Sequence, residues 1–251
     1  MIQDAAIAIG LFALLLVAEE IGFRTGRRAG SEEDARASSQ IGVVQGAMLG
    51  LLGLLLAFSF AAAGTRFLER QDLIIQEANS IGTAYLRADL LDEPSRAELR
   101  AALKRYTEFR IEFSARLRYG IQPSDLAETE RIQARMWRTA VQGVAGKPQL
   151  AQVVLPPLND VIDLHSTRVF AGLKAVPPLV LGLLIACAGG SVGVMSYGTG
   201  LGGHRRPVLT FSLAAIIGAS LWITIDLDRP RAGLMQLSDA PLKAINFEPA
   251  P

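Results

Sequence analysis

Long stretches without a single charged side chain alternate along this chain with stretches that are rich in charge. The uncharged stretches are Ala5–Ala18, Ile41–Thr65, Ala175–Gly203 and Pro207–Ile225. A helix needs about 20 apolar residues to cross the hydrocarbon core of a bilayer. The last three stretches reach that length, and the first reaches it if Glu19 and Glu20 lie at the interface. The pattern therefore predicts transmembrane helices over residues 4–22, 41–65, 177–197 and 207–226.

The segment between the second and third spans, residues 66–174, reads as a helical soluble domain. No run alternates with a period of two residues, as a half-buried strand would. Ser95 with Glu98 resembles a capping box and opens a charged amphipathic helix predicted to reach Tyr119. Later helices are expected over Ser124–Gly143 and Leu150–Ala175, the second interrupted at Pro156 and Pro157.

These elements predict an all-α membrane protein in which two hairpins flank the soluble domain. The hairpins occupy residues 1–65 and 175–227, and residues 228–251 form a tail without regular structure. Helix three is expected to end in the glycine-rich turn Gly198–Gly203.

The second span carries a regular stripe of small residues. They recur in steps of four, four and three, at Gly42, Gly46, Gly50, Gly53, Ala57, Ala61 and Gly64. A small stripe lets two helix backbones approach closely in lipid. The mean step is close to the value of about 3.67 residues that favours a right-handed crossing. The stripe predicts close helix packing, either within the chain or between subunits.

The other side of this span and its extension are the candidate pore or polar axis. In the span the row contains Gln45, Leu49, Leu52, Leu56, Ser59 and Phe60, which fits a narrow water path with a hydrophobic constriction, a lipid-facing surface or a helix contact. Past the span comes QEANSIGTAYLRADLL, Gln76–Leu91. A continuous helix would gather Gln76, Asn79, Ser80, Thr83 and Arg87 on one side, and Ile74, Ala78, Ile81, Tyr85 and Ala88 on another. Because the polar side is mostly amide and hydroxyl, we expect it to face polar neighbours or water.

Charged residues at the ends of two spans are candidate interface ion pairs. Glu19 and Glu20 precede Arg24 by four or five residues, and Asp226 and Asp228 adjoin Arg229. Acidic residues at membrane depth are costly and often functional. Local pairing at the interface is one interpretation, and an ion site at a pore mouth is the other.

Composition narrows the chemistry. Mean hydropathy is +0.31 and the net charge is +1, which gives no reason to expect nucleic acid as a partner. The single cysteine, Cys187, excludes a disulfide framework. Both histidines, His165 and His204, are far apart in the sequence, and no metal-ligand spacing is present. We therefore expect no catalytic, cofactor or metal site, and an enzyme is the weakest hypothesis.

Several blocks together resemble the bacterial bestrophin-like domain family. They are LLGLLLAFSF, QEANSIGTAYLRADLL, RYTEFRIEF and DLDRPRAG, with an early E-x-G-x-x-x-G pattern at Glu20, Gly22 and Gly26. The family takes its name from bestrophins, which are pentameric anion channels with four membrane helices per subunit, the second of which lines the pore. The resemblance implies a homo-oligomer, a pentamer by analogy, in the bacterial cytoplasmic membrane. No acidic cluster here resembles the bestrophin calcium clasp.

The side of the membrane on which the soluble domain lies is predicted differently by two arguments. The short loops carry six arginines, which the positive-inside rule places in the cytoplasm, namely Arg24, Arg27, Arg28, Arg36, Arg205 and Arg206. That would put the soluble domain outside, whereas the resemblance to bestrophins puts it inside.

Two functions remain open from the sequence. The first is a homo-oligomeric ion channel, selective for anions by family analogy, in which helix two lines the axis. The second is a membrane-anchored sensor or assembly partner that binds proteins through its helical domain, with the charged helix from Ser95 as the working surface. Lipid, other copies of the chain and inorganic ions are the partners expected for the channel.

Overall fold

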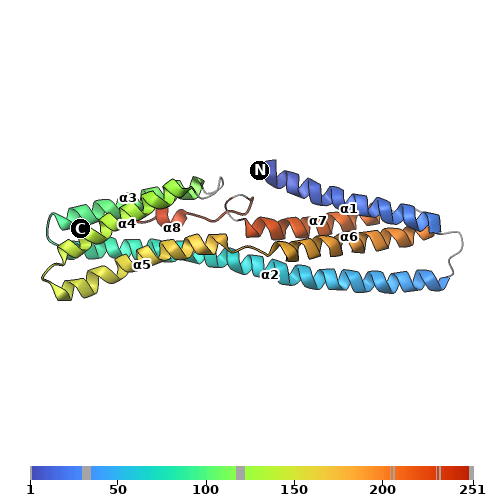
Figure 1. Ribbon diagram of the computed structural model, residues 1–251, viewed down its shortest axis with the longest axis horizontal. Helices are drawn as coiled ribbons and strands as arrows, with labels where there is room; N and C mark the ends of the chain where they lie inside the picture. Colours follow the sequence, from blue (N-terminus) through green and yellow to red (C-terminus); the bar gives the residue numbers. More distant parts are fainter. Residues whose placement is uncertain are drawn as a thin grey trace. The chain divides into compact units, whose positions relative to one another are not determined.

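The fold is that of a computed structural model, which describes residues 2–29, 35–116, 122–203, 205, 207–229, 231 and 233–248 (Figure 1). Within this part of the chain every regular element is a helix. The chain divides into two compact units. The first comprises Met1–Thr65 and Ala175–Met235, and the second comprises Arg66–Lys174 and Gln236–Pro251.

The prediction of four membrane spans is confirmed. Four helical stretches are long and apolar enough to cross a bilayer, namely Asp4–Ala29, Gln40–Leu90, Pro148–Leu201 and Pro207–Asp228. The chain is therefore an all-helical, multi-pass membrane protein.

In the first unit, α1 (Ile2–Ala29) packs along α6 (Pro178–Leu201) and against α7 (Pro207–Asp228). Their core is aliphatic and includes Leu15, Leu184 and Leu221, all about 1 % exposed. Such packing of apolar and small side chains is what holds helices together where lipid removes the hydrophobic driving force.

Glycines set the distance between α1 and α6. A Cβ atom added to Gly22 would lie 2.2 Å from the carbonyl oxygen of Gly193, and one added to Gly26 would lie 2.2 Å from that of Tyr197. From the other side, a Cβ on Gly200 would lie 2.4 Å from the carbonyl oxygen of Phe23. The two backbones are thus in direct contact over about two turns, which only glycine permits.

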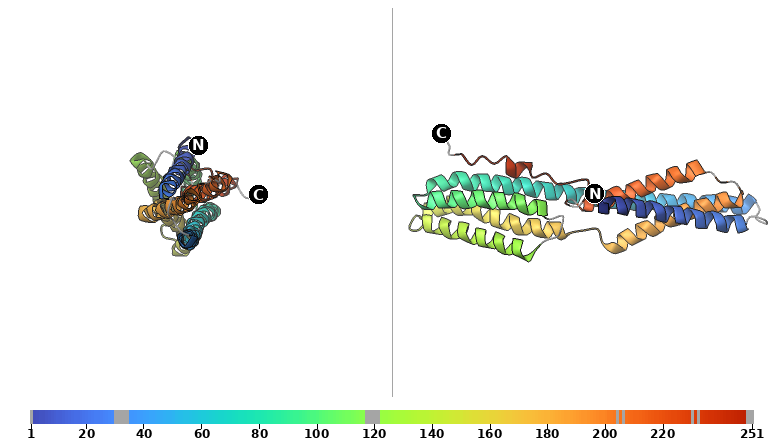
Figure 2. Two further views of the ribbon diagram at one scale, coloured as in Figure 1. Left: turned by 90° about the vertical axis from the view of Figure 1, so that its right-hand side faces the viewer. Right: turned by 90° about the horizontal axis from the view of Figure 1, so that it is seen from above.

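The second unit is a helical bundle with a buried apolar core. The helices α3 (Ser95–Arg116), α4 (Pro123–Gly143) and α5 (Pro148–Leu173) form this bundle together with the C-terminal part of α2 (Ala35–Arg87) and the short 3₁₀ turn Ala88–Leu90, and they run side by side in Figure 2. The five apolar positions expected on one side of α2 are all buried here: Ile74, Ala78, Ile81, Tyr85 and Ala88. Residues 117–121, which include the predicted end of the charged helix at Tyr119, lie outside the described residues.

Three predicted helix ends were wrong. α1 continues to Ala29 and α6 to Leu201, so Gly198 and Gly200 are helical and the turn is limited to Gly202 and Gly203, the second with a φ of 69°. Gly200 lies where the backbone of α6 contacts α1. α5 continues through Pro156 and Pro157 instead of breaking there, and a hydrogen bond from Arg87 to Val153 O replaces one that Pro157 cannot make.

The C-terminal tail was also expected to lack structure, and it packs onto the second unit. It contains the short helix α8 (Ala240–Lys243), in which Leu242 is 1 % exposed and belongs to the core. Gln71 bonds both backbone groups of Ser238, through Ser238 N–H at 2.9 Å and Ser238 O at 3.1 Å. Tyr85 donates its hydroxyl hydrogen to Phe247 O, and the two rings meet edge to face at 5.1 Å. The tail is therefore a structural part of the bundle.

Candidate functional site: the faces of helix α2

Inside the first unit, the predicted pore row of α2 is mainly the face that contacts the rest of the same unit. Leu52 and Ser59 are 2 % and 8 % exposed, while Gln45 and Leu56 are half-buried. Phe60 is the exception because it is 48 % exposed. The structure therefore departs from the expectation at Leu52 and Ser59. Their side chains are covered by helices of their own chain, so they cannot line an axis between several copies.

The small-residue stripe lies on the free face of the same helix. The helix-packing candidates Gly42, Gly46, Gly50, Gly53, Ala57 and Ala61 are all exposed. A Cβ atom built on any of the four glycines, or on Gly64, would meet nothing within 4 Å. Only 6 % of the apolar window of α2 is buried, against 22–33 % for the other three candidate spans. The stripe thus has the composition of a packing surface and no packing partner within the described chain.

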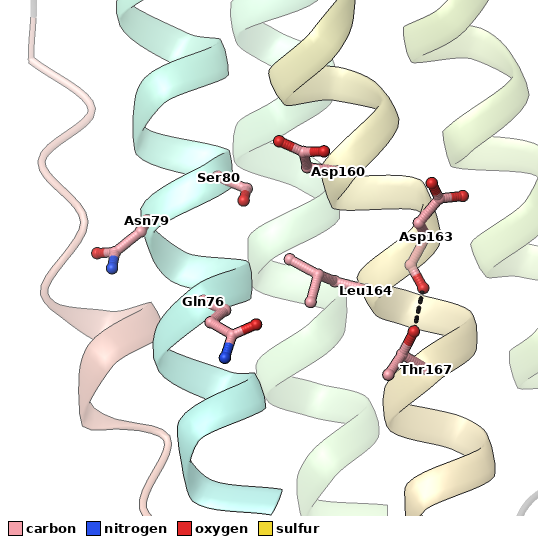
Figure 3. Close-up of a pocket in the computed structure, with 7 residues that line it drawn as sticks. All are labelled: Gln76, Asn79, Ser80, Asp160, Asp163, Leu164 and Thr167. Atoms are coloured by element: carbon pink, nitrogen blue, oxygen red, sulfur yellow. Dashed lines mark hydrogen bonds between the residues drawn. The ribbon is translucent and has the colours of Figure 1, made fainter. Parts of the chain in front are cut away.

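Beyond the span, three of the predicted polar residues line a pocket of about 440 Å³ between α2 and α5 (Figure 3). Gln76, Asn79 and Ser80 come from α2, and the side chain of Asn79 lies at the rim, where it points away from α5 (Figure 3). The wall from α5 is formed by Asp160, Asp163, Leu164 and Thr167. On α5, Thr167 donates its hydroxyl hydrogen to Asp163 O at 2.9 Å, and Asn159 Nδ2 donates to Asp163 Oδ2 at 2.8 Å. The pocket offers amide, hydroxyl and carboxylate oxygens to water or to a polar group. Thr83 lies exposed one turn further along α2.

Arg87 has a structural contact of its own. Its Nη1 donates a hydrogen bond of 2.7 Å to the carbonyl oxygen of Val153 on α5. Val153 lies four residues before Pro157, whose nitrogen has no hydrogen to give to that carbonyl. Arg87 therefore supplies the donor that the proline lacks. Burial of Val154, Pro157 and Leu158 in the core adds to the reason why α5 runs on without a break.

A buried cluster of charges in the second unit was missed by the sequence reasoning. The carboxylate of Glu77 is fully buried and accepts a hydrogen bond of 2.7 Å from the hydroxyl of Tyr106. It also accepts a hydrogen bond of 3.0 Å from Nε of Arg110 and forms an ion pair with Arg168. The side chain of Arg110 is 3 % exposed and that of Arg168 is 9 % exposed. The signal was present, because Glu77 lies between Ile74 and Ile81 on the apolar side of α2. A charge there predicts a buried partner.

Burial shifts the protonation equilibria of this cluster. Desolvation raises the pKa of Tyr106, while the positive charge of Arg110 acts in the opposite direction. Desolvation also lowers the pKa of Arg110, against the influence of Tyr106 and Asp239. A buried ion pair of this kind is costly to break from one side, because the remaining charge stays in the core.

The charged residues predicted to lie at the membrane interface make different contacts in the structure. Glu20 forms ion pairs with Arg24 at 2.6 Å and with Arg205 at 2.8 Å, while Glu19 lies half-buried beside it.

At the other membrane end, Asp226 is 4 % exposed and accepts hydrogen bonds from the backbone N–H groups of Leu234 and Met235 at 2.9 and 2.8 Å. Asp228 accepts one from Val176 N–H at 2.8 Å, and Arg229 is exposed. The two aspartates therefore act as anchors for the backbone that leaves α7 and enters α6.

The described part of the chain holds no group of three or more His, Cys, Asp and Glu side chains that could bind a metal ion. Comparison with known families finds one described as Bestrophin-like domain, which matches residues 11–242. No curated protein and no solved structure matches the chain. The matched range covers both units and all four candidate spans.

Proposed function

The chain belongs to the bestrophin-like domain family, and from that premise we propose that it is a homo-oligomeric ion channel. It would lie in the bacterial cytoplasmic membrane, with α2 at the contacts between subunits around the axis. The observation that carries the proposal is the free small-residue stripe of α2. The analogy with bestrophins supports anions as the conducted ions and five as the number of subunits.

The comparison with α1 and α6 explains why the open stripe matters. In that pair the space beside Gly22, Gly26 and Gly200 is filled by the backbone of the partner helix. On α2 the glycines face open space, although each costs up to about 1 kcal/mol of helix propensity relative to alanine. Lipid alone does not offset that loss of helix stability, because a lipid chain packs against alanine or leucine as well as against glycine. Close packing of a second helix against the stripe would offset it. Another copy of α2 fits the surface because its stripe is small as well.

The test uses the full-length protein in detergent and in planar bilayers. Native mass spectrometry gives the number of subunits, and currents are recorded from the same preparation in chloride and other salts. We expect a ring of subunits that conducts. A monomer, or a symmetric dimer without conductance, contradicts the proposal, and a monomer that binds a partner through α3 favours the sensor alternative.

Two substitutions link the oligomer to the stripe. Gly50→Leu and Gly53→Leu place bulk on the free face, at positions where an added Cβ meets nothing within 4 Å, and we expect both to weaken the oligomer and abolish the current. Gly182→Leu is the matched control, because Gly182 on α6 also faces open space. Equal behaviour of all three variants would contradict the role given to α2.

A further inference from the structure

The exposed face of α2 in the second unit continues as an ordered stripe. Opposite the buried Ile74, Ala78 and Ile81, six exposed positions follow one another in steps of four and three residues. They are Leu68, Asp72, Ile75, Asn79, Thr83 and Leu86, and we call them the outer stripe.

The composition of the outer stripe is unusual for a face in contact with water. Leu68 and Leu86 are 63 % and 60 % exposed, and Ile75 is 41 % exposed. Asp72 is the only charged member. Solvated helix faces in soluble bundles are normally rich in charge, as α3 is at Arg105 and Glu112, which form an exposed ion pair. Large apolar side chains that are exposed in a row mark an interaction surface.

The outer stripe keeps the register of the small-residue stripe. Gly42, Gly53, Gly64, Ile75 and Leu86 are spaced 11 residues apart, and the steps between them repeat as four, four and three. α2 is one helix from Ala35 to Arg87, so no break interrupts the repeat. An 11-residue repeat keeps one face of a helix toward its neighbours when the helices coil with a right hand. Small residues occupy the repeat in the span, and larger ones occupy it beyond.

We propose that the outer stripe packs against the outer stripes of other copies of this chain, as a parallel right-handed bundle of α2 helices. This rests on the homo-oligomer proposed above and assigns it a contact outside the membrane. Copies in one membrane insert with the same orientation, so a rotation axis brings identical residues of parallel helices to the same level.

The residue types suit such layers. Leu68, Ile75 and Leu86 would each contact the same residue of the other copies. Asn79 and Thr83 can donate to and accept from their own copies, the arrangement by which polar residues fix register in helix bundles. Asp72 is the position at which copies repel, and its layer needs water or a cation between the carboxylates.

An unrelated protein partner fits these features less well. Its surface would have to follow an 11-residue repeat that begins inside the membrane, at positions that another membrane helix can reach. A second copy meets that condition without further assumptions.

Cysteine crosslinking in membranes tests the bundle. Cys187, the only cysteine of the chain, is first replaced in Cys187→Ser. Single cysteines are then placed along 68–83 of the full-length protein, and disulfides are formed with copper phenanthroline. We expect crosslinked dimers to be most abundant at Leu68, Asp72, Ile75, Asn79 and Thr83, at least tenfold above Val141→Cys. Val141 on α4 is the matched control because it is 42 % exposed, nearly the same as Ile75.

The outcomes separate this inference from the function on which it rests. Maxima that fall at other positions of α2, or yields no higher than at Val141, overturn the outer-stripe contact. If the same preparation is an oligomer that conducts, the proposed function survives that result. A preparation that is monomeric in the membrane overturns both. As a second readout, Ile75→Asp should weaken the oligomer, and Val141→Asp should leave it unchanged.

Discussion

Replacing Gly26 by alanine tests whether the backbone contact between α1 and α6 governs the stability of the first unit. The new Cβ would lie 2.2 Å from Tyr197 O, about 0.8 Å inside the 3.0 Å that real Cβ atoms respect. The atom it meets is backbone, so no side chain can rotate away and the helices must separate. Overpacking of this kind costs about 1–3 kcal/mol, and the better helix propensity of alanine returns up to about 1 kcal/mol. A net loss of about 1–2 kcal/mol corresponds to a melting temperature lower by about 2–8 °C for a chain of this size.

The measurement is thermal unfolding in detergent, followed by reaction of Cys187 with a thiol-reactive fluorophore. Cys187 suits this because it lies half-buried on α6. Gly10→Ala and Gly182→Ala are the controls, since a Cβ at either position meets nothing within 4 Å. They should leave the melting temperature unchanged or raise it, because only the helix-propensity gain applies. If Gly26→Ala melts together with these controls, the close approach of the two backbones is not what holds the helices.

Three further substitutions address the contacts that the sequence did not reveal. Arg87→Met should destabilise the second unit by about 1 kcal/mol. The loss should be much smaller in a Pro157→Ala background, because alanine supplies the N–H that Val153 O lacks. Thermal melts of the double-mutant cycle measure both losses, and equal losses would exclude the proline explanation. Asp226→Asn should speed proteolysis of the segment after α7, because it replaces one of two backbone-bound oxygens by a donor; digestion at the wild-type rate would contradict this. Lys147 holds the pKa of Asp92 below its usual value of 3.8 through a hydrogen bond and its charge. The stabilisation is therefore present above that pH and lost as the pH falls through the lower folded-state pKa, and Lys147→Gln should flatten the acid limb of a stability curve; an unchanged limb would refute this.

The membrane spans and the buried side of α2 could be predicted because each depends on a simple pattern. Uncharged runs of sufficient length leave few alternatives to a span, and the helical spacing from Ile74 to Ala88 left one side apolar. Helix ends were harder to predict. Pro157 ends a helix by its local chemistry, yet the lost hydrogen bond is replaced by Arg87, which is distant in sequence.

The buried charge cluster is formed by residues that are far apart in the sequence. Glu77 meets Tyr106 and Arg110 from α3, and Arg168 from α5. The first three belong to the blocks QEANSIGTAYLRADLL and RYTEFRIEF, through which the chain resembles its family. The resemblance therefore marked the right residues, but only the structure shows that they act together. The same holds for Asp226 and Gly233 of DLDRPRAG, where a Cβ on the glycine would lie 2.2 Å from the carboxylate.

Which face of α2 is free could not be read from the sequence, because small residues and leucines both suit a helix contact in lipid. In the structure, the same stretch of α2 has its charged anchor on one side and its free stripe on the other. Glu77 is tied to two helices by hydrogen bonds and ion pairs, whereas Ile75 and Asn79, each two residues away and so about half a turn along the helix, are exposed. A helix fixed in this way cannot rotate to bury its exposed leucines and isoleucine inside its own bundle without breaking a buried ion pair, which costs about 3–5 kcal/mol. The exposed face is therefore held outward by the interior of the domain. A surface maintained in that orientation is better explained by a partner than by loose packing.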